Sequence, residues 1–347
     1  MKIAIIGDSH FGARSDSPIF RDYFAKFYDE IFFPYILKNN INTVVHLGDF
    51  LDRRKFVNFE TLKKSADILD KFKGLDLHII LGNHDTYYKN TSSINSLELL
   101  FKDKAKIYKD CTDIVIDGKS IALIPWINDD NHADFRMFLA NTKSKIAFGH
   151  FELQGFQVMR NVACDHGLDP IELSQFDAVY SGHFHQKHDN GKIFYLGTQY
   201  DMTFADVDEV KGFHVLDTDT MELEFIVNPR KLFYKIHYKD DIDISNVDLH
   251  DSFAKIIVSS KPSQTKFEKF LEDVYAKNPH DITVIEEYEL FSNTEAKIDE
   301  TKDTVTIICD EVDALEDIGD KSAIKNIITD LYVMSQSIEG TDNESED

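Results

Sequence analysis

The sequence predicts an α/β fold in which two mixed β-sheets pack face to face with helices on the outside. Short apolar or β-branched runs alternate with amphipathic stretches over the first hundred residues, as in strands followed by crossover helices. Beyond that point, short strands separated by turn residues replace the alternation. Five apolar runs end on a glycine that is followed by Asp, Asn or His. In sheets flanked by helices, ligands bind at the carboxyl ends of strands, so these five ends predict one site.

The first hundred residues divide into three strand-and-helix pairs. Apolar runs of strand length predict strands at 2–6, 43–47 and 77–81. Amphipathic stretches after them predict helices at Pro18–Asn39, Asn58–Phe72 and Ser93–Lys102. Pro18 suits the first helical turn, because the N–H that it lacks would have no helical partner there.

The next part of the chain is richer in strands. Asp117-Gly118 is a hairpin signal, and a helix around 130–142 divides the strands on either side of it. The strands are predicted at 105–109, 113–117, 120–125, 145–148, 177–181, 192–196, 212–217 and 222–227. These strands complete the two mixed sheets.

Pro229 and the basic pair Arg230-Lys231 mark a boundary in the sequence. We expect a catalytic domain over 1–230 and a small α+β module over 231–288, with strands at 232–238, 253–259 and 281–286 and a helix at 265–278. The remainder is predicted as an acidic linker (289–313), a helical segment (314–338) and a disordered acidic tail (339–347). Apolar residues at helical spacing over 320–338 give that segment one apolar face.

Composition narrows the class of protein. A chain of 347 residues with 42% hydrophobic content is long enough for one large and one or two smaller domains. No run of eighteen apolar residues predicts a membrane span, and the polar residues soon after Met1 do not suit a signal peptide. The three cysteines are scattered and odd in number, so we expect a reduced, cytoplasmic setting.

The net charge of −24 counts against nonspecific phosphate binding by the chain alone. About half of the excess follows Phe291, where sixteen acidic residues stand against four lysines. Weak, strongly salt-dependent DNA binding is therefore expected unless a partner helps.

The five strand ends predict a centre for two divalent cations. His, Asp and Asn ligands without a thiolate suit Mn, Fe or Zn rather than a structural zinc site. One carboxylate must bridge the pair, because an anion between two dications relieves their repulsion, and Asp49 is the candidate. One cation is expected to take Asp8, His10, Asp49 and His185, and the other Asp49, Asn83, His150 and His183.

Two residues beside these ligands are candidates for catalysis. His84 follows Asn83 directly and is not needed as a ligand, so we expect it to protonate a leaving oxygen or to stabilise charge there. A supporting role alone is the alternative. Asp85 is expected to accept the ring N–H of His84 and to fix its tautomer.

Cationic residues that follow the strand ends in sequence are candidates for phosphate contacts. The run Arg53-Arg54-Lys55 closely follows Asp49, and Arg14 and Lys89 stand near other clusters in sequence. Such contacts would position DNA without reading its sequence. A solvated entry to the following helix is an equally simple interpretation of the run.

The motifs D-x-H, GD, GNHD, GH and GHxH, in this order, resemble the calcineurin-like metallophosphoesterase superfamily over roughly the first 230 residues. Within it, the chain is similar to the SbcD-like double-strand-break repair nucleases, and especially to the recombination endonuclease subunits of T-even phages. The shared stretches are LIPW at Leu123–Trp126, and the runs Gly149–Phe156, His166–Pro170, Ser181–His185 and Leu196–Thr198. A protein phosphatase of this superfamily would end the third motif in Glu, whereas here it ends in Asp85.

The resemblance implies a manganese-dependent nuclease, with magnesium as the alternative cation. Such proteins are 3′→5′ exonucleases on duplex ends and endonucleases on single strands or hairpins. They work as homodimers with a Rad50/SbcC-like ATPase, and a phage origin would place this one in the bacterial host cytoplasm. By position, 231–288 would be a DNA-capping domain and 314–338 the ATPase-docking segment.

Two other classes of function stay open at this stage. A small-molecule phosphodiesterase or phosphatase of the same superfamily would have an identical metal site, although it would have little use for some 120 residues after Arg230. A scaffold without enzymatic activity would be expected to have lost a ligand, and all seven are present.

Overall fold

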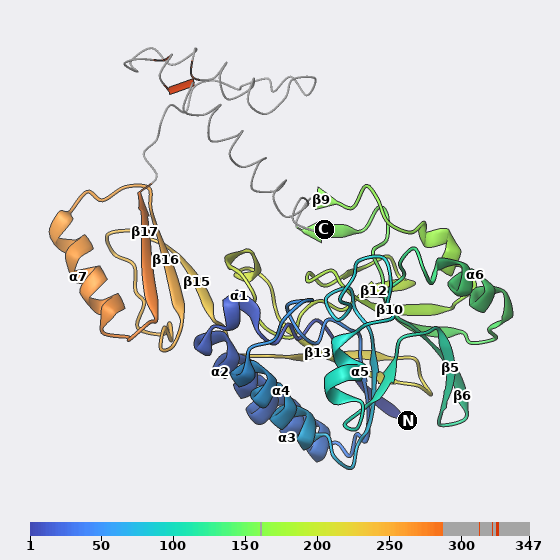
Figure 1. Ribbon diagram of the computed structural model, residues 1–347. Helices are drawn as coiled ribbons and strands as arrows, with labels where there is room; N and C mark the ends of the chain where they lie inside the picture. The colour runs from blue at the N-terminus through green and yellow to red at the C-terminus, as the bar shows by residue number, and fades with distance from the viewer. Residues whose placement is uncertain (160–161, 287–311, 313–320, 322–323, 326–347) are drawn as a thin grey trace. The chain divides into compact units, whose positions relative to one another are not determined.

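The computed structural model describes residues 1–159 and 162–286, together with the isolated positions 312, 321, 324 and 325 (Figure 1). A compact unit spans Met1–Glu287. The expected linker at 289–313, helical segment at 314–338 and tail at 339–347 lie outside the described residues, apart from those isolated positions.

The first sheet has six strands in the order β14-β13-β1-β2-β3-β4. Its centre is parallel from β1 to β4, while β13 runs antiparallel to β1 and β14 antiparallel to β13. The strands are β1 (Lys2–Ile6), β2 (Thr43–His46), β3 (Asp76–Ile80), β4 (Lys106–Tyr108), β13 (Gly212–Asp217) and β14 (Leu223–Val227).

The second sheet also has six strands, in the order β11-β12-β10-β7-β6-β5. Its four inner strands are parallel and its two edge strands are antiparallel to their neighbours. The strands are β5 (Thr112–Ile116), β6 (Lys119–Ile124), β7 (Ile146–His150), β10 (Ala178–Gly182), β11 (His188–Asp189) and β12 (Ile193–Tyr195). A separate hairpin joins β8 (Gln157–Met159) and β9 (Val162–Ala163).

Alternating side chains of β1 show how the sheets pack. Ile3 and Ile5 are buried in a cluster with Ile121 and Phe148 of the second sheet, so this apolar layer lies between the sheets. Ala4 belongs instead to a second cluster with the helices that cover the outer face of the first sheet. The predicted face-to-face arrangement of two mixed sheets with flanking helices is therefore confirmed.

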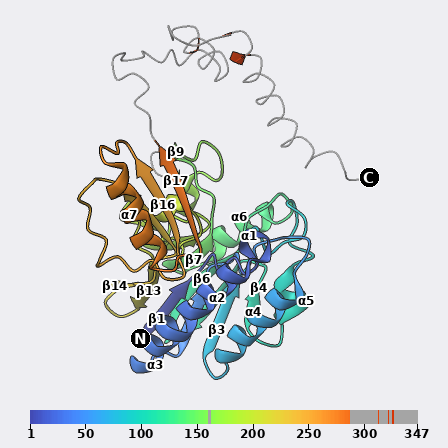
Figure 2. The ribbon, with the colours of Figure 1, turned by 90° about the vertical axis from the view of Figure 1, so that its left-hand side faces the viewer.

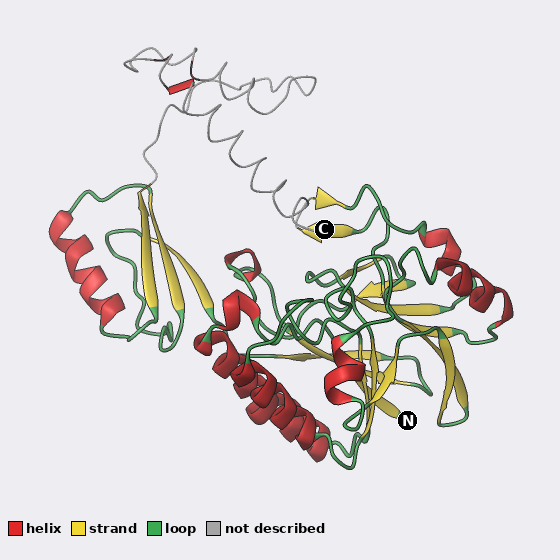
Figure 3. Ribbon diagram, viewed as in Figure 1, coloured by secondary structure: helices red, strands yellow, loops and turns green. Residues whose placement is uncertain are grey.

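The helices cover the outer faces of the sheets, and α2, α3 and α4 lie side by side in Figures 1 and 2. Figure 3 separates helices from strands by colour. The α-helices are α1 (Ala13–Asp16, a single distorted turn), α2 (Pro18–Phe27), α3 (Phe33–Lys38), α4 (Phe59–Lys71), α5 (Ser96–Phe101), α6 (His132–Asn141) and α7 (Gln264–Tyr275). Two 3₁₀ turns are η2 (Pro170–Leu173) and η3 (Phe204–Asp206).

The single helix expected over Pro18–Asn39 is wrong in one respect. A π-helical turn, η1 (Tyr28–Phe32), separates α2 from α3. Tyr28 and Phe32 are both almost fully buried, and the Tyr28 hydroxyl lies 2.8 Å from Ser9 Oγ. The wider turn thus allows two large rings to enter the core, and π-turns of this kind often occur near functional sites.

The helix predicted from Ser93 begins later, at Ser96. Asn95 is its N-cap, because its side-chain oxygen accepts a hydrogen bond from Glu98 N at 2.8 Å. Residues 93 and 94 therefore belong to the loop before the helix rather than to its first turn.

Residues 233–286 form a third sheet, with the parallel order β15-β16-β17 and helix α7 packed on it. Its strands are β15 (Phe233–His237), β16 (Phe253–Val258) and β17 (Asp281–Glu286). Asp201 Oδ2 accepts the N–H of Leu232 at 2.8 Å, and Lys26 Nζ lies 3.2 Å from Asp251 Oδ2. These contacts tie the module to the two large sheets.

Among the described residues, the helices lack the combination of length and apolar character that crossing a bilayer would require.

Candidate metal centre

Seven side chains that the sequence predicted as ligands lie around one point at the carboxyl ends of five strands. They come from both sheets, so the centre spans the junction between them. After β1, β2 and β3 the first sheet contributes Asp8, His10, Asp49 and Asn83, and at β7 and after β10 the second contributes His150, His183 and His185.

The backbone turns sharply where it presents these groups. Asp8, His10, Asp49 and His183 adopt left-handed conformations, with φ of 50°, 44°, 52° and 83°. Such angles are uncommon outside glycine and concentrate at functional sites, where surrounding structure must hold them. The turn expected between His183 and His185 is present, and their imidazoles join different clusters.

Gly82 makes the close approach of two of these loops possible. A Cβ atom at this position would lie 2.1 Å from Asp49 Oδ1 and 2.3 Å from Asp49 N. A larger residue would therefore displace the main chain of Asp49, which explains the glycine that precedes Asn83.

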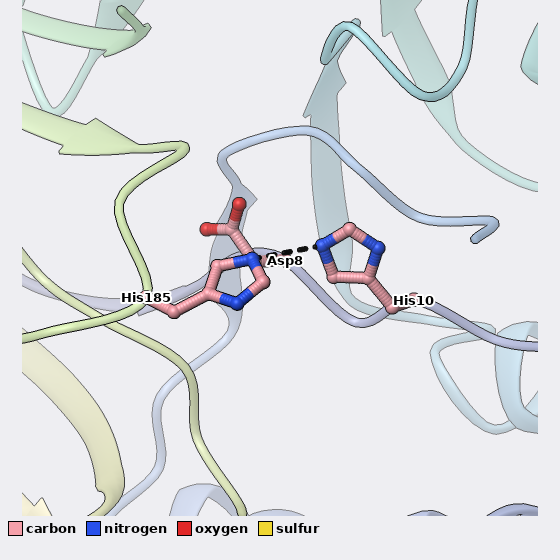
Figure 4. A group of neighbouring side chains, drawn as sticks. All are labelled: Asp8, His10 and His185. Carbon is pink, nitrogen blue, oxygen red and sulfur yellow. Dashed lines mark hydrogen bonds between the residues drawn. The ribbon is translucent and has the colours of Figure 1, made fainter. Parts of the chain in front are cut away.

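The first cluster consists of Asp8, His10 and His185 (Figure 4). The two Nε2 atoms of the histidines are 3.1 Å apart and face each other. Asp8 is fully buried, and its Oδ2 has no hydrogen-bond partner among the described residues. Burial raises the pKa of Asp8, because a charged carboxylate needs a nearby positive charge when water is excluded.

The second cluster consists of Asn83, His150 and His183. Asn83 Oδ1 lies 2.9 Å from His150 Nε2 and 3.0 Å from His183 Nδ1. His150 Nδ1 donates to the carbonyl of Leu47 at 2.7 Å, so in the neutral ring Nε2 offers a lone pair. The amide oxygen of Asn83 and the lone pair on His150 Nε2 are close enough to bind the same cation.

Asp49 lies between the two clusters. Its Oδ2 is 3.4 Å from His150 Nε2 and 3.7 Å from His10 Nε2. Burial alone would lower the pKa of His150, but Asp49 and Asp8 outweigh it and raise that pKa to about 9. The concentration of negative charge that attracts this proton would attract a divalent cation as well, so the position of Asp49 suits a bridge.

The donor set fits divalent cations. Imidazole nitrogens together with carboxylate and amide oxygens suit Mn, Fe or Zn, and the unpartnered Asp8 Oδ2 is a buried oxygen for which a cation would supply the missing partner.

The expected bond between His84 and Asp85 is wrong. His84 Nδ1 contacts the carbonyl of Asp52 instead. The Asp85 carboxylate accepts main-chain N–H groups, from Gly82 at 2.8 Å, from Asp49 at 2.9 Å and from Phe50. Asp85 therefore holds the loop after β2 in place, and a main-chain carbonyl orients the His84 ring.

Two supporting contacts were missed by sequence reasoning. Glu152 Oε1 lies 3.5 Å from His183 Nε2, and Asp52 Oδ1 lies 3.3 Å from His10 Nδ1. A further contact lies behind the first cluster, where His46 Nε2 is 2.7 Å from Ser9 Oγ. Glu152 and Asp52 each stand two or three residues after a ligand, which is the only signal that the sequence offered.

The five candidate DNA-binding cations differ in their surroundings. Arg53 forms an ion pair with Asp16, and Arg54 is half-buried and donates to Thr86 Oγ1 at 3.1 Å. Arg14, Lys55 and Lys89 are exposed. Burial lowers the pKa of Arg54, and the negative charges of Asp49 and Asp85 act against that lowering.

A family model of calcineurin-like phosphoesterases matches residues 1–187. Together with the fold and the strand-end clusters, this match shows that the chain belongs to the calcineurin-like phosphoesterase family, and it is thus a metal-dependent phosphodiesterase. Over 341 residues it is 31% identical to exonuclease subunit 1 of Enterobacteria phage T4, covering 96% of this chain and 99% of that protein. The family resemblance predicted from the motifs is confirmed.

Two solved structures are also similar in part. An archaeal phosphodiesterase shares 16% identity at a TM-score of 0.33, covering 66% of this chain and 100% of that one. A protein of unknown function from Aquifex aeolicus shares 20% identity at a TM-score of 0.26, covering 47% of this chain and 82% of that one.

Proposed function

We propose that this protein is the manganese-dependent nuclease subunit of a DNA recombination and repair complex, a 3′→5′ exonuclease on duplex ends and an endonuclease on single strands and hairpins. The observation that carries the proposal is the position of Asp49 Oδ2 between two ligand clusters. It occurs in a chain that matches an exonuclease subunit over almost its whole length.

The ligand sets follow from the clusters. We assign Asp8, His10, Asp49 and His185 to one cation and Asp49, Asn83, His150 and His183 to the other. When bound, two divalent cations neutralise charge on a phosphodiester and lower the pKa of a coordinated water. The protein's own contribution is to hold these side chains rigidly, through Asp85 on the main chain of the Asp49 loop and Glu152 beside His183.

His84 is assigned to the leaving oxygen. Its Nδ1 donates to the carbonyl of Asp52, so its Nε2 would carry the proton for that oxygen in the protonated, cationic ring. Its ring centroid lies 4.9 Å from that of His10, which puts it beside the first cluster.

We assign Arg14, Arg53, Arg54, Lys55 and Lys89 to phosphates of the DNA backbone. Residues 231–288 would cap the bound DNA. The net charge of −24 limits what these cations achieve alone, so tight binding would require a partner, for which we propose a Rad50/SbcC-like ATPase docked on 314–338. The name of the T4 relative, a subunit, is consistent with an assembly. The complex would act in the cytoplasm of a bacterial host.

A homodimer is supported by one exposed apolar surface. Phe56, Ile94, Leu99 and Leu100 line a single hollow around the start of α5, and their side chains are 68%, 44%, 70% and 39% exposed. We call these four residues the α5 patch. An exposed group of large apolar side chains is typical of an interaction surface, and a twofold interface would cover the same patch on both copies.

A substrate comparison tests the proposed function. The full-length protein with manganese is given linear duplex DNA, hairpin DNA, a cyclic nucleotide and a phosphate monoester, and Asp49→Asn is the control for contaminating nuclease. We expect manganese-dependent release of nucleotides from DNA to exceed turnover of both small substrates. Faster turnover of the cyclic nucleotide or the monoester would overturn the assignment in favour of a small-molecule enzyme.

A further inference from the structure

A small hollow adjoins the metal centre on the side of the second sheet. Its volume is about 200 Å³, and its walls include Trp126, Asn128, Asp129, His132, Glu152 and Leu168. His150, a proposed ligand, lines the same hollow. The Trp126 ring centroid lies 5.2 Å from that of His183. A phosphate bound at the centre would therefore have a neighbouring nucleotide at the mouth of this hollow.

The size and walls of the hollow select its occupant. A cavity of about 150 Å³ can bind benzene, so about 200 Å³ admits a single planar ring system. Trp126 and Leu168 supply aromatic and aliphatic surface, whereas Asp129 and Glu152 supply carboxylates. Carboxylates repel phosphate but accept hydrogen bonds from the amino groups of bases. The chemistry therefore favours a neutral nucleobase over a phosphate group.

The loop that carries Trp126 is held by its own hydrogen bonds. Trp126 N donates to the carbonyl of Leu81 at 2.8 Å, and Asn131 Nδ2 donates to the carbonyl of Trp126 at 2.9 Å. The buried Asn128 donates to Ser92 Oγ at 2.9 Å. These hydrogen bonds fix the main chain on both sides of the indole before any substrate binds. Binding therefore costs little conformational entropy in this loop.

From these observations we propose that the hollow holds one unpaired base of the DNA substrate, stacked on Trp126, next to the phosphate that is cut. This inference rests on the proposed nuclease function and specifies its substrate, because a base in the hollow must first leave its duplex partner. Because the bound base must be unpaired, the protein would cut single strands, frayed ends and hairpin loops in preference to intact duplex. Trp126 is a specificity-determining residue in this scheme.

Abasic oligonucleotides test the proposal. Single-stranded DNA with one defined cleavage position is prepared intact, with an abasic site on the 5′ side of the cut phosphate, and with one on the 3′ side. The full-length wild-type protein, Trp126→Ala and Trp126→Phe are compared in manganese. Hydrolysis of bis(p-nitrophenyl) phosphate, which has no base, is measured in parallel, and Met137→Ala, at an exposed apolar residue of α6, is the matched control.

Stacking on an aromatic side chain contributes about 1–3 kcal/mol per base, so one of the two abasic substrates should be cut roughly 5- to 150-fold more slowly by the wild type. Trp126→Ala should show a loss of similar size on intact DNA and no further loss on that abasic substrate. Trp126→Phe should recover most of the rate. For Trp126→Ala, the ratio of DNA cleavage to bis(p-nitrophenyl) phosphate hydrolysis should fall, whereas for Met137→Ala it should not change.

Other outcomes overturn the inference in distinguishable ways. One such outcome is that the wild type cuts both abasic substrates as fast as intact DNA, and another is that Trp126→Ala loses the same factor in rate on DNA and on the small diester. Either result would show that the hollow holds no base, while the nuclease assignment stands. If the wild type hydrolyses the small diester but does not cut DNA, the proposed function fails and the base pocket fails with it.

Discussion

Asp85 shows how a single buried carboxylate can organise a catalytic loop without entering the chemistry. It is fully buried, and its two oxygens accept N–H groups from four different residues around the centre. Burial, reinforced by the nearby Asp49, raises the pKa of Asp85 to about 7. The main-chain hydrogen bonds that Asp85 accepts hold the Asp49 loop against the end of β3. Its carboxylate therefore does not bind His84, and the carbonyl of Asp52 accepts the hydrogen bond from His84 Nδ1 instead.

The role of His84 leads to a first prediction. His84→Ala should retain both cations, because His84 belongs to neither proposed ligand set, yet it should lose about 100-fold or more of the nuclease rate, as expected when a general acid is removed. Metal content by elemental analysis and cleavage of linear duplex DNA measure the two quantities. His237→Ala, at an exposed histidine of β15, is the control and should behave as the wild type. Cleavage by His84→Ala at the wild-type rate would leave His84 without a chemical role.

At the residue level, the grouping of the proposed ligands was predictable from the sequence, whereas the groups that orient them were not. Each proposed ligand lies at or just after the carboxyl end of a strand, so a pattern along the chain was sufficient to collect them. The partner of His84 is a main-chain carbonyl 32 positions away, and main-chain groups leave no mark in a sequence. The same applies to the carbonyl of Leu47 that orients His150.

At the level of elements, Asp201 joins the small module to the large sheets. Its Oδ2 accepts the N–H of Leu232 at 2.8 Å and lies 3.4 Å from Phe233 N, at the first strand of the module. Burial raises the pKa of Asp201 to about 6 against the pull of these bonds. At neutral pH the buried Asp201 carboxylate is charged, and this charge lowers the free energy of unfolding.

This raised pKa gives a second prediction. Between pH 4 and 6 the folded protein binds more protons at Asp201 than the unfolded chain, so the contribution of this group to the free energy of unfolding falls as pH rises through that window. A shift of about two units corresponds to about 3 kcal/mol. Asp201→Asn removes this titration while keeping an acceptor oxygen.

Urea unfolding of wild type and Asp201→Asn at pH 4.5, 5.5, 6.5 and 7.5 measures the effect. Relative to wild type, the variant should gain about 2 kcal/mol between the lowest and the highest pH, because the series begins above the pKa of the unfolded chain. A constant difference across the series would mean that Asp201 does not titrate in this window. Asp217→Asn is a useful control, because the pKa of Asp217 lies below its ordinary value and most of its titration lies below the window.

Elements with strong periodicity were predicted well, and local exceptions were not. Apart from the two-residue β11, the strands of both large sheets and of the small module were found because their apolar runs are short and bounded by turn residues. The π-turn at Tyr28–Phe32 lies within a continuous amphipathic pattern, and the reason for it, a hydroxyl that reaches Ser9, exists only once β1 has packed beneath the helix. The hairpin β8–β9 has strands of three and two residues, which is too short for a periodic signal.

For the whole molecule, the important fact is that the seven proposed ligands come from both large sheets. A cation bound by residues from both sheets would connect them, so binding should stabilise the fold by mass action. At a hundredfold excess over the dissociation constant the gain is about 2.7 kcal/mol, which corresponds to an increase in Tm on the order of 5 °C. Calorimetry with manganese and with a chelator measures this third prediction.

The variant Asp49→Asn provides the control, because it weakens both ligand sets at once. Its Tm should respond much less to manganese than that of the wild type. Equal shifts in the two proteins would show that manganese binds elsewhere.

A fourth prediction concerns assembly. Leu99→Glu introduces a charge in the middle of the α5 patch and should convert a dimer to a monomer, because a charge is costly to bury in an apolar interface. Leu37→Glu, at a residue 66% exposed on α3 and outside the patch, should leave the dimer intact. Light scattering after size exclusion gives the mass of each. A wild-type monomer at high concentration, or a dimeric Leu99→Glu protein, would show that the patch is not the interface.

The thickness of the apolar layer between the sheets fixes how far apart the two halves of the ligand set stand. Ile5, Leu123 and Phe148 belong to that layer and are completely buried, and none of them is a ligand. Substitutions that thin or widen the layer by a methylene would change the separation of the donor atoms and, with it, the radius of cation that fits best. The interior of the protein, remote from any reacting atom, would then be where its choice among manganese, magnesium and zinc is tuned.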